Sequence, residues 1–248
     1  AVDAFGKLSD QVNQAAVYYA LGRLELKRGK YDQAEDYLSR SIQMTEKMHR
    51  IPTSRDLSVA FFGSIHDRYQ AYIECLMGKH QLDPARALDV KAFETSEAAR
   101  ARSLAEFLRA TNTDFARDVD ATLAQQEKSL RQSIWQKADY RSQLLTSRET
   151  ASSLSELKSV NTELSQLEAE YSRLIETINQ RYPAYKQIAQ PAAWDMRRIQ
   201  EEIIKDDQTL LLEFSIGASK SYVWAVTHDK IKTFEIPGEE AITQAERK

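Results

Sequence analysis

The order of apolar and polar residues predicts a chain that begins with helices. Residues 12–28 carry apolar side chains at near-helical spacing, and Gly29 follows as a stop signal. A second helix is expected from Tyr31 to about Met48. Because only a short turn separates them, the two helices should form an antiparallel hairpin whose apolar edge needs a neighbour.

A second helical pair is predicted over residues 57–77 and 84–108. Gly78 is expected to end its first helix. Asp83 is expected to cap the second helix, and Pro84 suits a first helical turn because its missing N–H has no intrahelical partner there. The pattern therefore indicates two stacked hairpins.

The segment from Phe115 to Tyr182 contains no Gly or Pro, which favours long helices. Its second half has a heptad seam, and its first half offers a less regular apolar stripe. Two Ser/Thr-x-x-Glu capping boxes mark residues 146–155 as the turn. We expect an antiparallel helical hairpin, with an intermolecular coiled coil as the alternative. The seam residues are Leu157, Val160, Leu164, Leu167, Tyr171, Leu174 and Ile178.

The apolar period changes from 3.6 to 2 near the end of the chain, after a short helix expected at 192–205. Residues 209–216, 221–227 and 231–236 alternate as strands, which predicts a three-stranded meander. Apolar residues also occur on the opposite face, so we expect cover on both sides. A further helix should begin at Gly238. Since three such strands are not stable alone, we expect the domain to continue beyond this chain.

The first hairpin resembles a tetratricopeptide (TPR) unit at a set of spaced positions. Small residues at 22 and 34 suit that pattern, because two helices approach closely only where side chains are short. Glu46 stands where the pattern usually has Pro, so the second helix should run on beyond a minimal repeat. The matching positions are Tyr18, Leu21, Gly22, Gly29, Tyr31, Ala34 and Leu38.

Four segments together resemble bacterial TPR–CHAT proteins. They are residues 93–108 (FETSEAARARSLAEFL), 181–185 (RYPAY), 206–214 (DDQTLLLEF) and 221–227 (SYVWAVT). The last two are similar to the opening strands of the CHAT domain, a relative of the caspase-like cysteine peptidases. This resemblance implies a parent protein in which a Cys thiolate, paired with a His, attacks a peptide carbonyl. No position of this chain matches that dyad, so we assign no catalytic residue.

The expected fold class is mainly α, with a TPR-like helical solenoid, a long antiparallel helical hairpin and an opening β-meander. We expect TPR-like repeats over residues 1–112 and the hairpin or coiled coil over 113–190. Residues 191–248 would begin an incomplete α/β, caspase-like domain.

Composition narrows the classes of partner. The 248 residues are 42% hydrophobic and 29% charged, which is typical of a folded protein. A net charge of −3 disfavours nucleic acid, which needs clustered Lys and Arg. No apolar run approaches the roughly 20 residues that span a bilayer, so no membrane partner is expected. One cysteine suits a reducing compartment, and we expect a cytoplasmic protein.

The residues whose side chains could react or bind a metal are better explained by structural roles. Cys75 lies among apolar residues of a predicted helix, where a thiol is a small hydrophobe. His66 and His80 have no metal-ligand spacing, and His228 matches no catalytic position. The carboxylates alternate with Lys and Arg on solvated helix faces. The sequence therefore predicts no catalytic, cofactor-binding or metal-binding residue, and no cofactor.

Two features suggest protein partners. The groove formed by stacked TPR-like pairs suits a protein or peptide partner. Arg100, Arg102 and Arg109 could dock an acidic peptide or hold the helical hairpin in place, and structural use is favoured. Self-association through the hairpin stays open.

The leading functional hypothesis is a regulatory, partner-binding portion of a CHAT-type cysteine peptidase. This chain by itself should be inactive. The alternative is a non-catalytic TPR and coiled-coil scaffold for protein–protein interaction.

Overall fold

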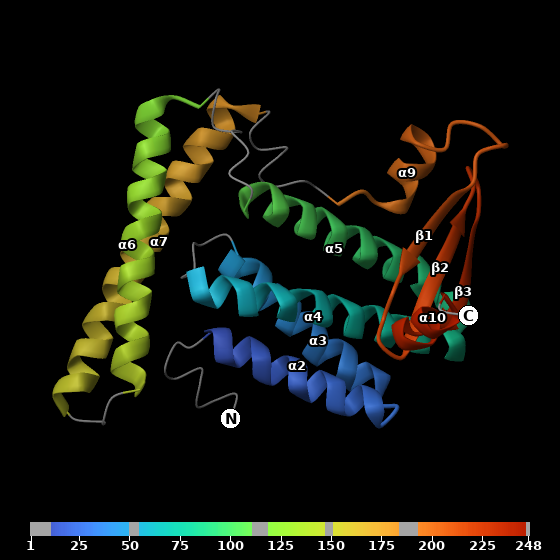
Figure 1. Cartoon of the computed structure of the whole chain (residues 1–248), viewed down its shortest axis with the longest axis horizontal. Coiled ribbons are helices and arrows are strands. Elements are labelled where there is room, and N and C mark those ends of the chain that lie inside the picture. Colours follow the sequence, from blue (N-terminus) through green and yellow to red (C-terminus); the bar gives the residue numbers. More distant parts are fainter. Residues whose placement is uncertain (1–10, 50–54, 111–118, 147–150, 184–192, 247–248) are drawn as a thin grey trace. The chain divides into compact units, whose positions relative to one another are not determined.

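The computed structural model describes residues 11–49, 55–110, 119–146, 151–183 and 193–246. These residues are mainly helical and end in a small antiparallel sheet, as expected (Figure 1). The elements are α2 (Gln11–Lys27), α3 (Tyr31–His49), α4 (Arg55–Leu82), a 3-10 turn (Pro84–Arg86), α5 (Leu88–Ala110), α6 (Ala121–Thr146), α7 (Ala151–Arg181), α9 (Met196–Glu202), β1 (Leu211–Ser215), β2 (Lys220–Val226), β3 (Ile231–Pro237) and α10 (Glu239–Glu246).

The chain contacts define two compact units. Unit 1 comprises residues 1–18, 40–65 and 104–191, and unit 2 comprises 19–39, 66–103 and 192–248. Unit 1 contains the α6–α7 pair, and unit 2 contains the sheet. Each unit is described separately.

The turn between α2 and α3 is made by glycine, as the sequence predicts. Gly29 has a φ of +72°, a left-handed conformation that residues with a Cβ adopt only at a cost. The N–H of Lys30 donates to the carbonyl of Glu25 over 2.9 Å and closes the end of α2. α3 then begins at Tyr31, so both predicted helix boundaries at this turn are confirmed.

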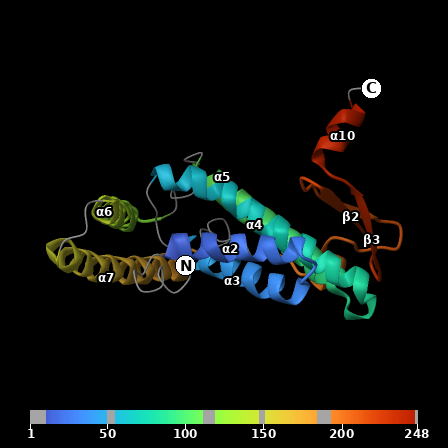
Figure 2. The ribbon, with the colours of Figure 1, turned by 90° about the horizontal axis from the view of Figure 1, so that it is seen from below.

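Close helix contact explains the small residues of the first hairpin. In unit 2, a Cβ placed on Gly22 would lie 2.5 Å from Cγ of Leu38, and Ala34 and Leu38 are fully buried. In unit 1, the hydroxyl of Ser41 donates to the carbonyl of Ala15 over 2.7 Å. α2 and α3 therefore lie side by side, as both views show (Figures 1 and 2).

Gly78 does not end a helix, and this prediction was wrong. α4 runs on through Gly78 to Leu82. A Cβ at Gly78 would collide with the ring of Tyr31, so the glycine makes room for an aromatic side chain of α3. The cost of glycine within a helix, about 1 kcal/mol relative to alanine, is easily outweighed by such packing.

The start of α5 also differs from the prediction. Pro84 opens a short 3-10 turn rather than the α-helix, and the Asp83 side chain makes no capping hydrogen bond. Ala87 then adopts a left-handed conformation with φ of 47°, and α5 begins one residue later at Leu88. The chain thus reverses direction before α5 rather than within its first turn.

In unit 1, α6 and α7 form the predicted antiparallel hairpin within one chain. Ile134 of α6 and Val160, Leu164 and Tyr171 of α7 form its core. Of the seven heptad-seam residues, Leu167 and Leu174 are half-buried and the others are buried. Cross-helix pairs run in opposite order along the two helices: Tyr171 with Glu127, Lys137 with Glu163, and Tyr140 with Glu156. Residues 147–150, which belong to the predicted turn at 146–155, lie outside the described residues.

In unit 2, the three predicted strands form an antiparallel sheet in the order β1-β2-β3. Register pairs Glu213 with Trp224 and Trp224 with Thr233, so these three side chains share one face. The predicted short helix is confirmed as the shorter α9, capped by Asp195. α10 begins after Gly238, also as predicted.

Candidate functional site

The junction of α5 with the sheet is the most specific side-chain arrangement in unit 2. Trp224 of β2 is fully buried, and Phe93 of α5 meets it edge to face with ring centroids 6.0 Å apart. At the neighbouring β3, the hydroxyl of Thr233 donates to Asp89 of α5 over 3.2 Å. α5 therefore contacts the sheet through both apolar and polar groups.

α4 and α9 add further contacts to the same sheet. The hydroxyl of Ser215 on β1 donates to Gln70 of α4 over 3.0 Å. The amide of Gln200 on α9 donates over 3.0 Å to the carbonyl of Thr227, which follows β2. Glu94 of α5 accepts a hydrogen bond from the N–H of Met196, at the start of α9. Polar side chains from three helices thus fix the position of the strands.

A buried carboxyl group lies at the centre of the α5 contact. The Glu213 side chain on β1 is 1% exposed, and its Oε1 lies 3.3 Å from Nη2 of Arg100. The same Arg100 nitrogen donates to the carbonyl of Phe214 over 3.0 Å. Arg100 also lies 3.5 Å from Glu97 on its own helix. One guanidinium therefore faces two carboxyl groups and a strand carbonyl.

Burial favours the uncharged form of the Glu213 side chain. Loss of water contact, followed by the close carboxyl of Glu97, raises the pKa of Glu213 to about 8. A hydrogen bond with Ser96 and the charge of Arg100 act in the opposite direction but do not compensate. At neutral pH the Glu213 carboxyl therefore holds a proton.

Glu213 was not predicted from the sequence, because strand alternation favours its neighbours Leu212 and Phe214 as the buried residues of β1. Sequence reasoning did single out Arg100, but for another role: the observed contacts of Arg100 join α5 to β1. The side chain of Arg109 lies outside the described residues.

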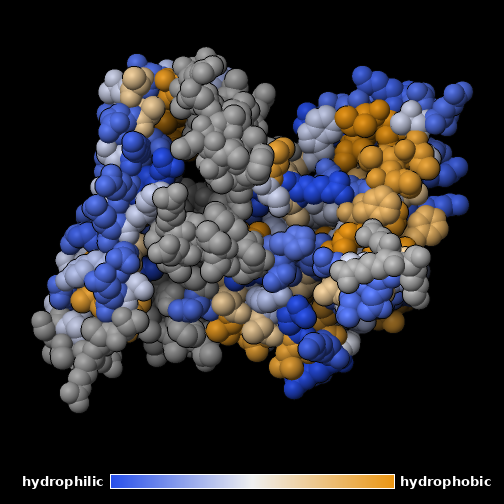
Figure 3. All heavy atoms as spheres, in the orientation of Figure 1, coloured by the Kyte–Doolittle hydropathy of each residue, from blue (hydrophilic) through white to orange (hydrophobic). Residues whose placement is uncertain are grey.

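The other face of the sheet is apolar and exposed. Leu212 and Phe214 of β1 and Phe234 of β3 are each about half exposed, at 51%, 50% and 51%. Figure 3 shows hydrophobic surface gathered over this part of unit 2. The expectation that the sheet is covered on both faces is therefore met on one face only within the described residues.

A second polar cluster lies where α3, α4 and α5 meet in unit 2. Lys79 of α4 is 7% exposed and pairs with Asp32 and Glu35 of α3. Lys91 of α5 reaches Glu35 over 2.8 Å. Desolvation would lower the pKa of Lys79, but its hydrogen bonds with the two carboxylates raise it overall. The acids and bases neutralise one another, which indicates a structural network.

The other side chains that could react or bind a metal do not form a cluster within the described residues. Cys75 is fully buried and donates to the carbonyl of Tyr31, and burial raises its pKa to about 12. His66 and His228 are exposed, whereas His80 lies 3.5 Å from Asp89. Within the described residues, no three potential metal ligands converge. Nor does any described helix combine the length and apolarity that crossing a bilayer requires.

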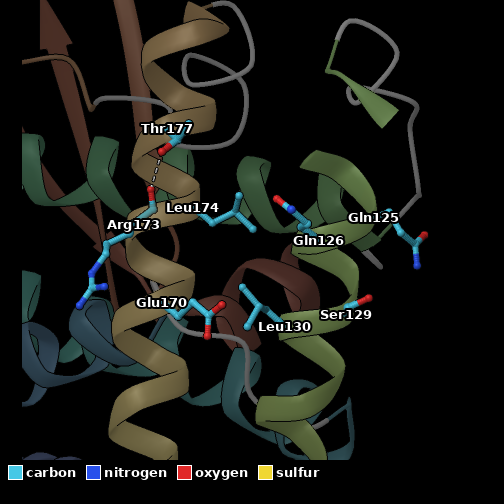
Figure 4. A pocket seen from close by; sticks show the side chains of 8 residues that line it. All are labelled: Gln125, Gln126, Ser129, Leu130, Glu170, Arg173, Leu174 and Thr177. Atoms are coloured by element: carbon cyan, nitrogen blue, oxygen red, sulfur yellow. Dashed lines mark hydrogen bonds between the residues drawn. The ribbon is translucent and has the colours of Figure 1, made fainter. Parts of the chain in front are cut away.

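Unit 1 has a groove along the α6–α7 hairpin. It encloses about 450 Å³ and is open to solvent. Figure 4 shows Leu130 and Leu174 extending into the space between the two helices, with Gln126 and Glu170 near them. No nucleophile and base converge among these side chains, so the groove is better suited to contact than to chemistry. Its lining residues are Gln125, Gln126, Ser129, Leu130, Glu170, Arg173, Leu174 and Thr177.

Comparison with known proteins adds no identification: the chain matches no family model, no curated protein and no solved structure.

Proposed function

We propose that this chain is the regulatory, partner-binding portion of a CHAT-type, caspase-like cysteine peptidase. TPR-like helices would receive a protein or peptide partner, and the strands would begin the peptidase domain. The single observation that carries the proposal is the α5–sheet junction. It joins a helix of the expected second TPR-like pair directly to the first strands of the expected CHAT-like domain.

Close packing in the helical part supports this proposal. The approach of Gly22 to Leu38 is the contact that small residues allow in TPR-like hairpins. Tyr31 of α3 packs on Gly78 of α4, so the first hairpin is followed by a stacked neighbour. Stacking of successive hairpins generates an extended surface on which a partner helix or peptide can bind.

The α5–sheet junction also offers a route for regulation. Because Arg100 and Phe93 contact β1 and β2 directly, a displacement of α5 would alter strand position. A ligand can shift such an equilibrium only by binding one arrangement better than another. Partner binding to the helices would therefore change the peptidase domain by favouring one arrangement of α5.

Peptide cleavage by the natural polypeptide that contains this sequence tests the proposal. A peptide library is incubated with that polypeptide, before and after alkylation of its thiols, and with this chain alone. We expect thiol-dependent cleavage by the parent only. Cleavage that persists after alkylation, or none with any partner added, would count against a cysteine peptidase.

The α6–α7 groove favours a second candidate, a non-catalytic scaffold. Its two leucines and its polar lining side chains suit contact with a protein surface, and no nucleophile and base converge among them. Substituting Leu130→Glu and Leu174→Glu should abolish assembly with a scaffold partner without changing any peptidase activity. Loss of peptidase activity together with assembly would instead support the regulatory role.

A further inference from the structure

The α5–β1 junction contains more acid than base. Glu213 enters it from β1, and Glu97 and Arg100 enter from α5. Arg100 is half exposed, whereas the Glu213 side chain is almost completely buried, so water stabilises the guanidinium far more than the buried carboxyl. Two carboxylates facing one guanidinium would leave an excess negative charge, and Glu213 would carry its charge in a place that water barely reaches.

A hydrogen bond with Ser96 and the charge of Arg100 favour the ionised form of Glu213, but burial outweighs both. Its strand neighbour is the uncharged ring of Trp224, and beyond that ring Thr233 is hydrogen-bonded to Asp89. Oε1 of Glu213 accepts no hydrogen bond from any described residue. The charged groups that act on it most strongly are Glu97 and Arg100, and the nearer α4 contact, Gln70 with Ser215, is neutral.

We propose that Glu213 keeps its proton, beside the carboxyl of Glu97, when β1 is docked on α5, and that loss of this proton releases the sheet from the helix. The contact between β1 and α5 then depends on protonation of Glu213. This inference does not rest on the proposed peptidase, because every group in it belongs to the described residues of unit 2.

The sign of the effect follows from proton linkage. An exposed Glu ionises near pH 4.5, whereas Glu213 in the docked sheet ionises near pH 8. Between these values the docked form holds a proton that the released form loses. The equilibrium constant for release should therefore rise with pH, by up to about tenfold per unit, and level off above pH 8.

Hydrogen exchange of β1 amides in the whole chain measures this release. After correction for intrinsic exchange, protection of β1 should fall on the order of tenfold or more between pH 6 and pH 8, then change little up to pH 9. Glu213→Gln keeps the shape but has no proton to lose, so its β1 protection should be flat across this range. Glu235→Gln on β3 is the matched control, because Lys220 lowers the pKa of Glu235 and it stays ionised throughout. This control should retain the wild-type profile.

Two results would overturn the proposal. One is β1 protection in the wild-type chain that does not change between pH 6 and pH 9. The other is a Glu213→Gln chain that loses protection with pH as the wild type does. If Glu213→Gln does not fold, carboxyl-carbon NMR of the wild type decides: a Glu213 carboxyl already ionised at pH 6 contradicts the proposal, and a titration near pH 8 supports it.

Discussion

Phe93 of α5 and Trp224 of β2 meet edge to face, with their ring planes at 80° and centroids 6.0 Å apart. Trp224 is fully buried, whereas Phe234 on the opposite face of the sheet is 51% exposed. The two faces of one small sheet therefore differ sharply in what they contribute to stability.

Substitution on the two faces should reveal this difference. Trp224→Ala should lower the free energy of unfolding by about 3–5 kcal/mol, because it leaves a cavity against Phe93. Phe234→Ala should cost no more than about 1 kcal/mol, as for other exposed positions. Urea unfolding followed by circular dichroism measures both. If Trp224→Ala does not fold, Trp224→Phe is the milder substitute, and equal costs for the two faces would contradict the assignment.

Gly22→Ala should destabilise the chain although alanine favours helices. The added methyl group would collide with Leu38, and overpacking of a filled core costs about 1–3 kcal/mol. The gain in helix propensity is at most about 1 kcal/mol. Equilibrium unfolding in urea should therefore show a net loss.

A double-mutant cycle separates collision from other causes. Leu38→Ala removes the atoms that the new methyl group would meet, so in that background Gly22→Ala should be neutral or stabilising. A similar loss in both backgrounds would mean that Gly22 does not lie against Leu38.

The sequence predicted elements where local pattern and local packing agree. Gly29 ends a helix because its left-handed backbone is a local requirement. The heptad seam from Leu157 to Ile178 predicted the α6–α7 contact because its period matches the helix. Three strands followed from period-2 alternation. In each case the deciding interaction lies within the element or between neighbours in sequence.

Prediction failed where the local structure depends on a residue far away in the sequence. Gly78 looks like a helix stop, but its role depends on the ring of Tyr31. On β1, alternation favours Leu212 and Phe214 as buried, yet Glu213 is buried in their place, on the face of the sheet that packs against α5. No local pattern reports a partner so far away along the chain. From the sequence, only Arg100 of the candidate site could therefore be recognised, and its partner Glu213 could not.

Cys75 should be inert in the folded chain. Burial raises its pKa to about 12, so at pH 8 its reactive thiolate fraction is on the order of a thousandfold lower than that of a free thiol. Reaction with a chromogenic disulfide reagent should be correspondingly slow, and fast after denaturation. Lys158→Cys in a Cys75→Ser background places a thiol at an exposed position of α7 and provides the control. Rapid labelling of native Cys75 would mean that its surroundings open readily.

Cross-linking can test whether the α6–α7 contact is made within one chain in solution. Lys137 and Glu163 form an ion pair of 2.6 Å across the hairpin, so Lys137→Cys and Glu163→Cys in a Cys75→Ser background place two thiols close together. A short bismaleimide should join them within one molecule. An intermolecular coiled coil with the same seam would join two molecules instead.

Mixing isotopically light and heavy chains before cross-linking separates these outcomes, because only an intermolecular link yields peptides of mixed label. We expect unmixed peptides and a product of monomer mass. Moving one thiol from position 163 to Glu176, farther along α7, should abolish the intrachain link while leaving the seam intact. Mixed-label peptides in the first variant would show that the heptad seam pairs two chains, and the single-chain hairpin would then be wrong.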